Sequence, residues 1–310
     1  MDFKFYKFKL LWYYILHRHG GNLVNGILLI NKPINITSRD VVNIAVKKLG
    51  TKKIGHTGTL DPLATGVMVL CIGKATKLVD LLTSEKKEYI AEVTFGIKTD
   101  TLDITGNVLK KEKTLISKSD ISKVLNSFQG KYSQEVPIYS AVKVNGKKLY
   151  EYARNNETVK LPSREVQIYN IEFLDYNNSG NYLKIKFKCL VSKGTYIRSL
   201  IKDICDKLGV IGTMSKLTRT KQGNFNLEDC IDVDDIALDR IINIKKILNI
   251  PKIYVDDNLK NKILNGQVLN NIYKFKKILF LDKQDNVLAI YQEYIKDKTK
   301  IKPYVILFNK

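Results

Sequence analysis

The segment at positions 55–66 most constrains how this chain can fold, because it can be neither an ordinary helix nor an ordinary strand. It carries glycines, small hydroxyl residues and a proline, which disfavour both regular structures. Before it, an amphipathic helical pattern ends at Gly50, and after it the apolar run 67–72 predicts a buried strand. The segment is therefore a loop between a helix and a strand. Its single carboxylate is Asp61, and we interpret it as a loop shaped for a ligand.

An isolated Asp-Pro pair is typical of a simple turn, so Asp61 would mean little without its surroundings. Here the whole pattern Gly-His-Thr-Gly-x-Leu-Asp-Pro-x-Ala-x-Gly is filled at positions 55–66. In this pattern the chain resembles the TruB family of tRNA pseudouridine synthases, whose catalytic loop has the same fixed residues. The resemblance assigns the catalytic aspartate, acting as a nucleophile, to Asp61.

The reaction that this resemblance implies breaks the N-glycosidic bond of a uridine and rejoins the ribose to C5 of the same base. A carboxylate can act as nucleophile at C6 or at C1′, or as a base at C2′, and the sequence leaves these roles open. The resemblance implies no cofactor and no metal. His17, His19 and His56 are the only histidines, and they suggest no histidine-based metal site.

A tyrosine is the expected partner of the reacting base. A stacked uridine has to be flipped out of its arm and held against an aromatic ring. Tyr89 begins the alternating pattern 89–95, which predicts a strand, and it matches the family's stacking tyrosine. A strand tyrosine is commonly a packing residue, but the family match favours base stacking for Tyr89.

A second motif, Ser-Lys-Gly-Thr-Tyr-Ile-Arg at 192–198, follows the clearest strand pattern of the chain and leads into a helix. The resemblance pairs Arg198 with Asp61 and places Tyr196 and Leu217 at the pocket. An arginine beside a carboxylate fixes its orientation and favours its charged form. The alternative for Arg198 is an exposed cation at the start of a helix.

Basic residues provide the expected contacts with RNA. In the family, the histidine that matches His56 contacts RNA near the flipped base, although a loop-ordering hydrogen bond is an alternative. Lys32 matches a supportive Lys-Pro pair. The tyrosine-rich segment 137–154 resembles the family's thumb insertion and is predicted to be a long loop with a short helix. Its lysines that suit phosphate contacts are Lys143, Lys147 and Lys148.

The charge of the chain favours a polyanionic partner. It has 52 Lys and Arg against 31 Asp and Glu, a formal net charge of +21, and such an excess attracts phosphates. A lysine-rich composition from a low-GC genome is the alternative explanation. Cysteines 71, 189, 205 and 230 form no CxxC pair, which indicates reduced thiols in a cytoplasmic protein.

Strands separated by helical insertions, without a repeating βαβ rhythm, predict an α+β fold. Ser38 is the expected cap of the helix that ends at Gly50, and Ser119 the expected start of another helix that ends at Gly130. The resemblance implies a pseudouridine synthase catalytic domain at 26–246. Its central sheet would be mixed and largely antiparallel, flanked by helices, with a thumb at about 137–165.

The register of the pattern changes near residues 245–250. Residues 256–264 predict a helix, and 278–281, 287–291 and 304–308 predict short strands. Short strands in so small a module predict a β-barrel. The segment 247–310 resembles a PUA-like RNA-binding domain.

The first 25 residues form a separate N-terminal extension. Its apolar run at 10–16 is too short to span a membrane, and an interfacial helix or an organellar presequence is one interpretation. The other is that the segment is not native and that Val24 marks the true start. We exclude it from the prediction of the fold.

The resulting hypothesis is a stand-alone, monomeric, cytoplasmic enzyme that makes pseudouridine at position 55 in the T arm of tRNA, without metal or membrane. A guide-RNA-dependent enzyme acting on ribosomal RNA is one alternative. A tRNA-folding chaperone with the same fold is the other.

Overall fold

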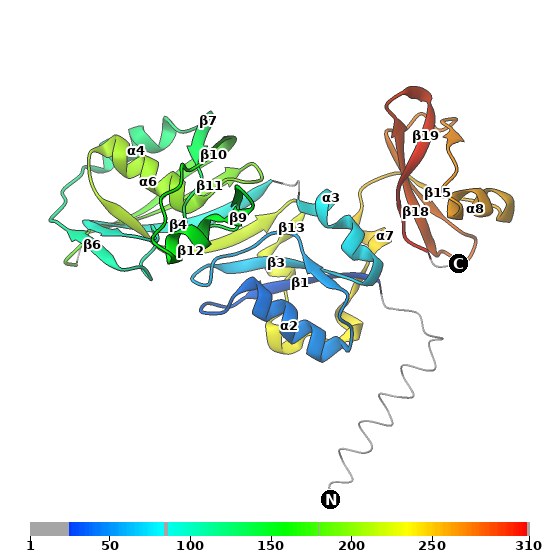
Figure 1. The fold of residues 1–310 in the computed structure, drawn as a ribbon, viewed down its shortest axis with the longest axis horizontal. Helices are drawn as coiled ribbons and strands as arrows, with labels where there is room; N and C mark the ends of the chain where they lie inside the picture. The colour runs from blue at the N-terminus through cyan, green and yellow to red at the C-terminus, as the bar shows by residue number, and fades with distance from the viewer. Residues whose placement is uncertain (1–24, 84–85, 179, 309–310) are drawn as a thin grey trace, which may run out of the picture.

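The computed structural model describes residues 25–83, 86–178 and 180–308, and the predictions for the N-terminal extension lie almost entirely outside them. A ten-stranded sheet forms the centre (Figure 1). Its strands are β1 (Gly26–Lys32), β2 (Ile54–His56), β3 (Thr65–Ile72), β4 (Lys87–Phe95), β7 (Gly130–Glu135), β10 (Ser163–Asn177), β11 (Lys184–Val191), β12 (Gly212–Gln222), β13 (Phe225–Asn226) and β14 (Ile242–Asn243).

The strands of this sheet follow the order β14-β1-β3-β12-β4-β11-β10-β7, with β13 beside β12 and β2 beside β3. All of these pairs are antiparallel except β3 with β12. The predicted mixed, largely antiparallel sheet is therefore confirmed. In this order β12 lies between the strand that follows the 55–66 loop and the strand that carries Tyr89, so Arg219 is opposite both Gly66 and Tyr89.

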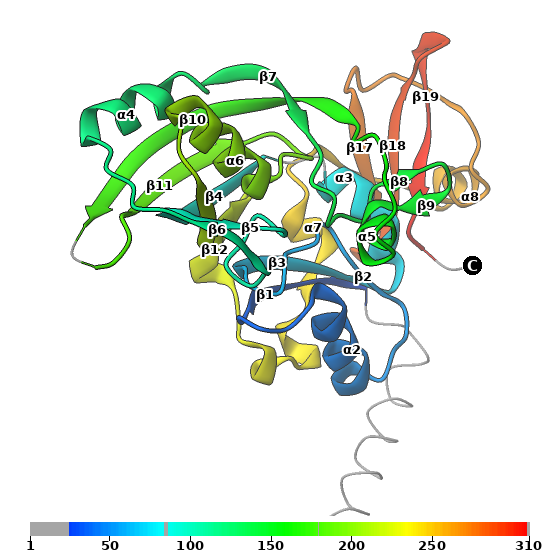
Figure 2. The ribbon, with the colours of Figure 1, turned by 60° about the vertical axis from the view of Figure 1, so that its left-hand side comes forward.

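Helices pack against both parts of the sheet. The long ones are α2 (Ser38–Leu49), α4 (Lys118–Asn126) and α6 (Ile197–Leu208). The core beneath α2 is built on β1 and β3, and a second core lies between α4, α6 and strands β4, β10, β11 and β12. Figure 2 shows α2 below β1 and β3, well apart from α6. A 3-10 turn, η1 (Gly73–Leu78), continued by the short helix α3 (Val79–Thr83), follows β3.

The C-terminal module is a five-stranded sheet, ordered β15-β17-β18-β19-β16, with one helix. Its elements are β15 (Lys252–Tyr254), α8 (Asp257–Leu264), β16 (Leu269–Asn270), β17 (Lys277–Leu281), β18 (Val287–Tyr294) and β19 (Asp297–Ile306). The predicted helix and strands are present. The last strand begins earlier than the apolar run at 304–308 predicts, because its polar first half pairs with β18 and β16.

The module and the central sheet share one hydrophobic core. Leu279, Ile290 and Val305 of the module pack in the same cluster as Leu78 of η1 and Val69 of β3. Short helices at Leu227–Asp229, Val233–Asp235, Leu238–Arg240 and α7 (Ile244–Ile247) lead from β13 toward the module, which stands beyond α3 and α7 in Figure 1. This shared core fixes the module against the sheet.

Three predicted helix boundaries are wrong. Thr37, not Ser38, caps α2: its side chain accepts a hydrogen bond from Asp40 N, and the Asp40 carboxylate accepts one from Thr37 N, which is a capping box. Ser117 caps α4, which ends at Asn126. Gly130 instead begins β7 at a φ of 116°. The helical pattern was extended too far because an apolar residue, Phe128, continues it beyond the last turn.

The segment predicted as a loop with a short helix contains more structure. Strands β8 (Lys143–Val144) and β9 (Lys147–Lys148) form a hairpin that leads into helix α5 (Leu149–Arg154). Asn145 and Gly146 both have positive φ, 50° and 81°, as the tight turn of a hairpin requires. This Asn-Gly pair was the signal in the sequence. A second small hairpin joins β5 (Ile97–Thr99) and β6 (Val108–Lys111).

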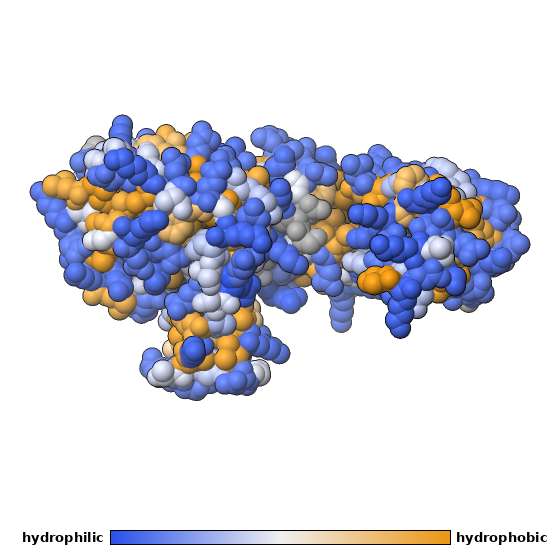
Figure 3. All heavy atoms as spheres, turned by 90° about the horizontal axis from the view of Figure 1, so that it is seen from above, coloured by the Kyte–Doolittle hydropathy of each residue, from blue (hydrophilic) through white to orange (hydrophobic). Residues whose placement is uncertain are grey.

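Hydrophilic residues cover most of the face that Figure 3 shows, including the lobe of the C-terminal module. None of the helices within the described ranges is long and apolar enough to cross a membrane. All four cysteines are free, and Cys71 and Cys189 are buried. Burial raises the pKa of the Cys71 thiol to about 12, so this thiol is unreactive at neutral pH.

Candidate active site

Asp61 and Arg198 form a two-pronged ion pair between segments that are far apart in sequence. Arg198 Nε donates to Asp61 Oδ2 at 2.8 Å, and Nη2 donates to Oδ1 at 3.1 Å. The arginine side chain is 6% exposed and the carboxylate side chain 30% exposed. A fork of this kind fixes the plane of a carboxylate. Asp61 is thus oriented from the protein side while part of it faces solvent.

The guanidinium of Arg198 is itself held by two backbone carbonyls. Its Nη1 donates to Thr101 O at 3.1 Å, and its Nη2 donates to Tyr139 O at 3.0 Å. Thr101 follows β5, and Tyr139 lies in the segment that leads to the β8–β9 hairpin. Arg198 therefore ties three separate parts of the chain to Asp61.

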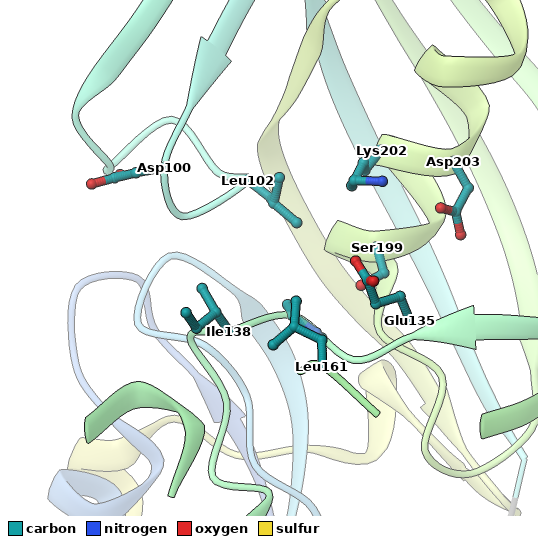
Figure 4. A pocket seen from close by; sticks show the side chains of 9 residues that line it. Asp100, Leu102, Glu135, Ile138, Leu161, Ser199, Lys202 and Asp203 are labelled. Atoms are coloured by element: carbon teal, nitrogen blue, oxygen red, sulfur yellow. The ribbon is translucent and has the colours of Figure 1, made fainter. Parts of the chain in front are cut away.

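A pocket lies where these same segments meet. Figure 4 shows Leu102, Ile138 and Leu161 on one side of it and Ser199 and Asp203 of α6 on the other. Three of these residues directly adjoin Arg198 or its backbone partners in the sequence: Leu102 follows Thr101, Ile138 precedes Tyr139 and Ser199 follows Arg198. The pocket is thus part of the surroundings of Arg198.

The loop on either side of Asp61 is pinned to the protein. Leu60 N donates to Ser38 Oγ at 2.8 Å, and Ser38 Oγ donates to Leu60 O at 3.1 Å. Pro62 O accepts from Asn35 N at 2.9 Å and from Lys32 Nζ at 3.2 Å. These bonds hold the backbone immediately before and after the carboxylate, so Asp61 has little freedom to move.

Lys32 is fully buried at the end of β1. Besides Pro62 O, its amine donates to Pro33 O at 2.8 Å and to Ile36 O at 2.7 Å. Burial lowers the pKa of Lys32 to about 8, against the opposing effect of the Asp61 charge. This placement makes Lys32 a support of the loop, and its expected contact with RNA stays a prediction.

Tyr89 lies in the core directly behind the loop. It is buried and packs in one cluster with Leu60 and Leu63 of the loop and with Leu217 of β12. Burial raises the pKa of the Tyr89 phenol, and a hydrogen bond with Arg219 opposes this shift. The residues predicted as base-stacking ring and pocket wall therefore lie together beside Asp61.

The comparisons with known proteins agree with this arrangement. Residues 46–197 match the model of the TruB family pseudouridylate synthase N-terminal domain. The tRNA pseudouridine synthase B of Bacillus subtilis is 40% identical over 93% of this chain and 99% of that protein. The enzyme of the same name from Caldanaerobacter subterraneus is 43% identical over 83% of this chain and 90% of that protein. The chain belongs to the TruB family.

Solved structures give the same result for the fold. A chain in the crystal structure of a Cbf5–Nop10–Gar1 complex superposes with a TM-score of 0.68 and 25% identity, over 91% of this chain and 85% of that one. A structure of an H/ACA RNP bound to a substrate RNA gives a TM-score of 0.66 at 24% identity. The fold shared with these structures thus extends across the sheet and the C-terminal module.

Arg219 belongs to this TruB-family site, although the sequence analysis assigned it no role. It is buried, and its Nε donates to Val67 O at 2.7 Å while its Nη2 donates to Gly58 O at 3.1 Å. With the bond to Tyr89, it connects the loop, β3 and β4. The signal was its spacing: it follows Leu217 by two along β12, and alternate residues of a strand share a face.

Gly66 allows β12 to approach the loop. Its φ is 102°, and a Cβ at this position would lie 2.3 Å from Arg219 O. No other residue type fits such a contact. The last glycine of the loop motif is therefore required by packing.

Tyr196 stands at the N-terminal end of α6, two residues before Arg198. Gln134 of β7, which the sequence analysis missed, holds its backbone: Tyr196 N donates to Gln134 Oε1 at 2.8 Å, and Gln134 Nε2 donates to Tyr196 O at 3.1 Å. The Arg164 guanidinium lies 5.4 Å from the centre of the Tyr196 ring. The ring is therefore half-buried, and the backbone that carries it is held by Gln134.

His56 is half-buried on β2. Burial, and then the charges of Arg39 and Arg219, lower its pKa, so the imidazole is neutral near pH 7. Within the described residues its buried Nδ1 has no hydrogen-bond partner. The loop-ordering bond considered for His56 is therefore absent at this nitrogen.

The predicted phosphate-binding lysines differ in their surroundings. Lys143 is exposed. Lys147 is paired with Glu157 at 2.5 Å and lies 4.8 Å from the centre of the Tyr152 ring. Lys148 donates to the Tyr150 hydroxyl at 3.1 Å. Of the three, Lys143 is the most available to a phosphate.

Proposed function

We propose that this chain converts uridine to pseudouridine in tRNA and that Asp61 carries the chemistry. The carrying observation is the fork between Asp61 and Arg198, which presents a fixed, partly exposed carboxylate beside an aromatic core. The name shared by the relatives, tRNA pseudouridine synthase B, supports this reaction and substrate.

The chemistry is an isomerisation. The bond between C1′ and N1 breaks, a bond between C1′ and C5 forms, C5 loses a proton and N1 gains one. Asp61 acts as the nucleophile in this scheme, at C6 or at C1′, or else takes a proton from C2′. Arg198 holds the carboxylate in a fixed orientation. The protein needs no redox partner, because the substrate and the product are isomers.

The flipped uracil is held by the apolar residues around the carboxylate. Tyr89 offers a ring face for stacking, Leu217 forms a wall, and Tyr196 lines the entrance. Exclusion of water is essential, since hydrolysis of the intermediate would release free base. The buried cluster of Tyr89 and Leu217 supports this role.

The remaining parts of the chain serve RNA binding. The substrate is the T arm, with uridine 55 as the target, and the β8–β9 hairpin with α5 is the thumb that closes over it. His56 contacts the RNA near the flipped base, and Lys143, Lys147 and Lys148 contact phosphates. The C-terminal module is a PUA-like domain, and the protein acts as a cytoplasmic monomer.

Pseudouridine mapping tests this proposal. Purified protein is incubated with an unmodified tRNA transcript, without guide RNA or other proteins, and the modified position is read out by sequencing after carbodiimide treatment. We expect modification at uridine 55 by the wild-type protein and none by Asp61→Asn. Failure with bare tRNA, with activity restored by a guide RNA and partner proteins, would favour the guide-dependent alternative.

A further inference from the structure

Three lysines meet where the central sheet touches the C-terminal module. Lys53 directly precedes β2, and its carbonyl accepts a hydrogen bond from Gly73 N at 2.8 Å. Lys74 and Lys77 lie on η1, which begins at Gly73. Lys77 Nζ donates to Ile306 O of β19 at 3.0 Å. We call Lys53, Lys74 and Lys77 the junction cluster.

Lys74 is the unusual member of this cluster. Its side chain is buried, with the residue 8% exposed, and its amine lies 6.0 Å from the centre of the Phe308 ring. Burial, and then the charges of Lys77 and Lys53, lower the pKa of Lys74. Among the described residues, no carboxylate forms an ion pair with any lysine of the cluster.

A positive cluster of this kind is energetically unfavourable unless an anion binds to it. Like charges repel, and a buried charge without a partner is destabilising. The neighbouring Lys260 also lies near the Phe308 ring, with its amine 5.2 Å from the ring centre. Unlike the lysines of the cluster, it forms an ion pair, with Asp282 at 2.8 Å. The junction cluster thus lacks the anion that its neighbour has.

One member of the cluster, Lys53, directly precedes the short strand that leads to the active site. From Lys53, β2 runs through His56 into the loop that carries Asp61. An extended residue spans about 3.3 Å, so the backbones of Lys53 and His56 are about 10 Å apart. The substrate RNA extends well beyond the reacting uridine, so a backbone phosphate outside the reacting nucleotide can lie near the junction.

We propose that the junction cluster binds a phosphodiester of the RNA substrate. This proposal rests on the proposed function, and the ligand of the site is a phosphate of the polynucleotide backbone. It positions the RNA where the central sheet and the C-terminal module meet and takes no part in the chemistry.

The test compares two triple variants that remove the same charge. In the first, Lys53, Lys74 and Lys77 are each changed to Gln. In the control, Lys98, Lys111 and Lys113, exposed at the β5–β6 hairpin, are changed to Gln. Binding of full-length tRNA is measured by filter retention over a range of salt concentrations. The rate of pseudouridine formation is measured over a range of tRNA concentrations up to saturation.

We expect the junction variant to raise KM and Kd for tRNA about tenfold or more, with kcat at saturation unchanged. The slope of log Kd against log salt should fall by about one or more, because each lost phosphate contact removes about 0.9. The control variant at the β5–β6 hairpin should change both the Kd for tRNA and this slope much less. Equal effects in the two variants, or a loss confined to kcat, would overturn the proposal.

Three further measurements keep the result decisive. Lys53→Gln alone alters an exposed residue, so it reports on binding even if the triple variant does not fold. Replacement of all three lysines by Arg should restore affinity. Inorganic phosphate at constant ionic strength should compete weakly, whereas strong competition would assign the site to the free ion. A wild-type protein that binds tRNA but makes no pseudouridine would contradict the proposed function alone.

Discussion

Ser38 and Leu60 exchange two hydrogen bonds through one hydroxyl group, which accepts from the Leu60 N–H and donates to the Leu60 carbonyl. Ser38 is the first residue of α2, and Leu60 immediately precedes Asp61. A helix residue thus fixes the backbone that positions the carboxylate. The hydroxyl is buried together with both groups that it binds.

We expect Ser38→Ala to lower kcat about tenfold and to destabilise the protein by about 1–3 kcal/mol, because it leaves two buried backbone groups without a partner. Thermal unfolding and single-turnover rates measure the two effects. Ser117→Ala is the matched control, since it removes the cap of α4 and should cost about 1 kcal/mol without changing kcat. Equal rates for wild type and Ser38→Ala would show that this bond does not position Asp61.

Asp61→Asn should abolish turnover and leave the affinity for tRNA within a few-fold of wild type. The carboxylate supplies the chemistry, whereas phosphate contacts supply the affinity. Asp80→Asn, an exposed carboxylate on α3, serves as the control. Near-normal turnover by Asp61→Asn would remove Asp61 from the catalytic role.

The two functions of Tyr89 can be separated. Tyr89→Phe keeps the ring but loses the hydroxyl that Arg219 binds, and Tyr89→Leu loses both. If the ring stacks on the base, kcat/KM should be lower for Tyr89→Leu than for Tyr89→Phe, by a factor that corresponds to about 1–3 kcal/mol of binding free energy. Equal losses would mean that the hydroxyl is the essential part.

Lys32 predicts a dependence of stability on pH. Its pKa is lowered from 10.5 to about 8 in the folded protein. Between these values the unfolded chain binds the proton more often than the folded one, so the free energy of unfolding rises with pH. Urea unfolding at pH 7, 9 and 10 should show this rise in wild type relative to Lys32→Met. A constant difference between the two proteins across this range would contradict the lowered pKa.

The thumb lysines should contribute unequally to RNA binding. Lys143→Ala should lower the slope of log affinity against log salt by about one. Lys147→Ala should lower it less, because Lys147 is already paired with Glu157. Filter binding of tRNA at several salt concentrations measures both slopes. A larger effect for Lys147 would mean that RNA displaces Glu157.

The sequence by itself determined the local elements and the identity of the reactive loop. Apolar alternation predicted β4 and β11, and Gly50, with a φ of 67°, ends α2 as predicted. These features depend on interactions within a few residues, which periodicity and capping describe well. The family motif at 55–66 singled out Asp61 for the same reason, since it is contiguous.

Only the tertiary structure decided what holds that loop in place. Arg219 binds Gly58 and Val67 because β12 lies beside both β3 and β4, and strand order is not a local property. Ser38 has a form suited to a helix cap but serves Leu60, since Thr37 already caps the helix. Lys32 and Lys74 look like surface lysines in the sequence, and both are buried. Such roles arise from contacts between distant segments, and a pattern that spans a few residues does not contain them.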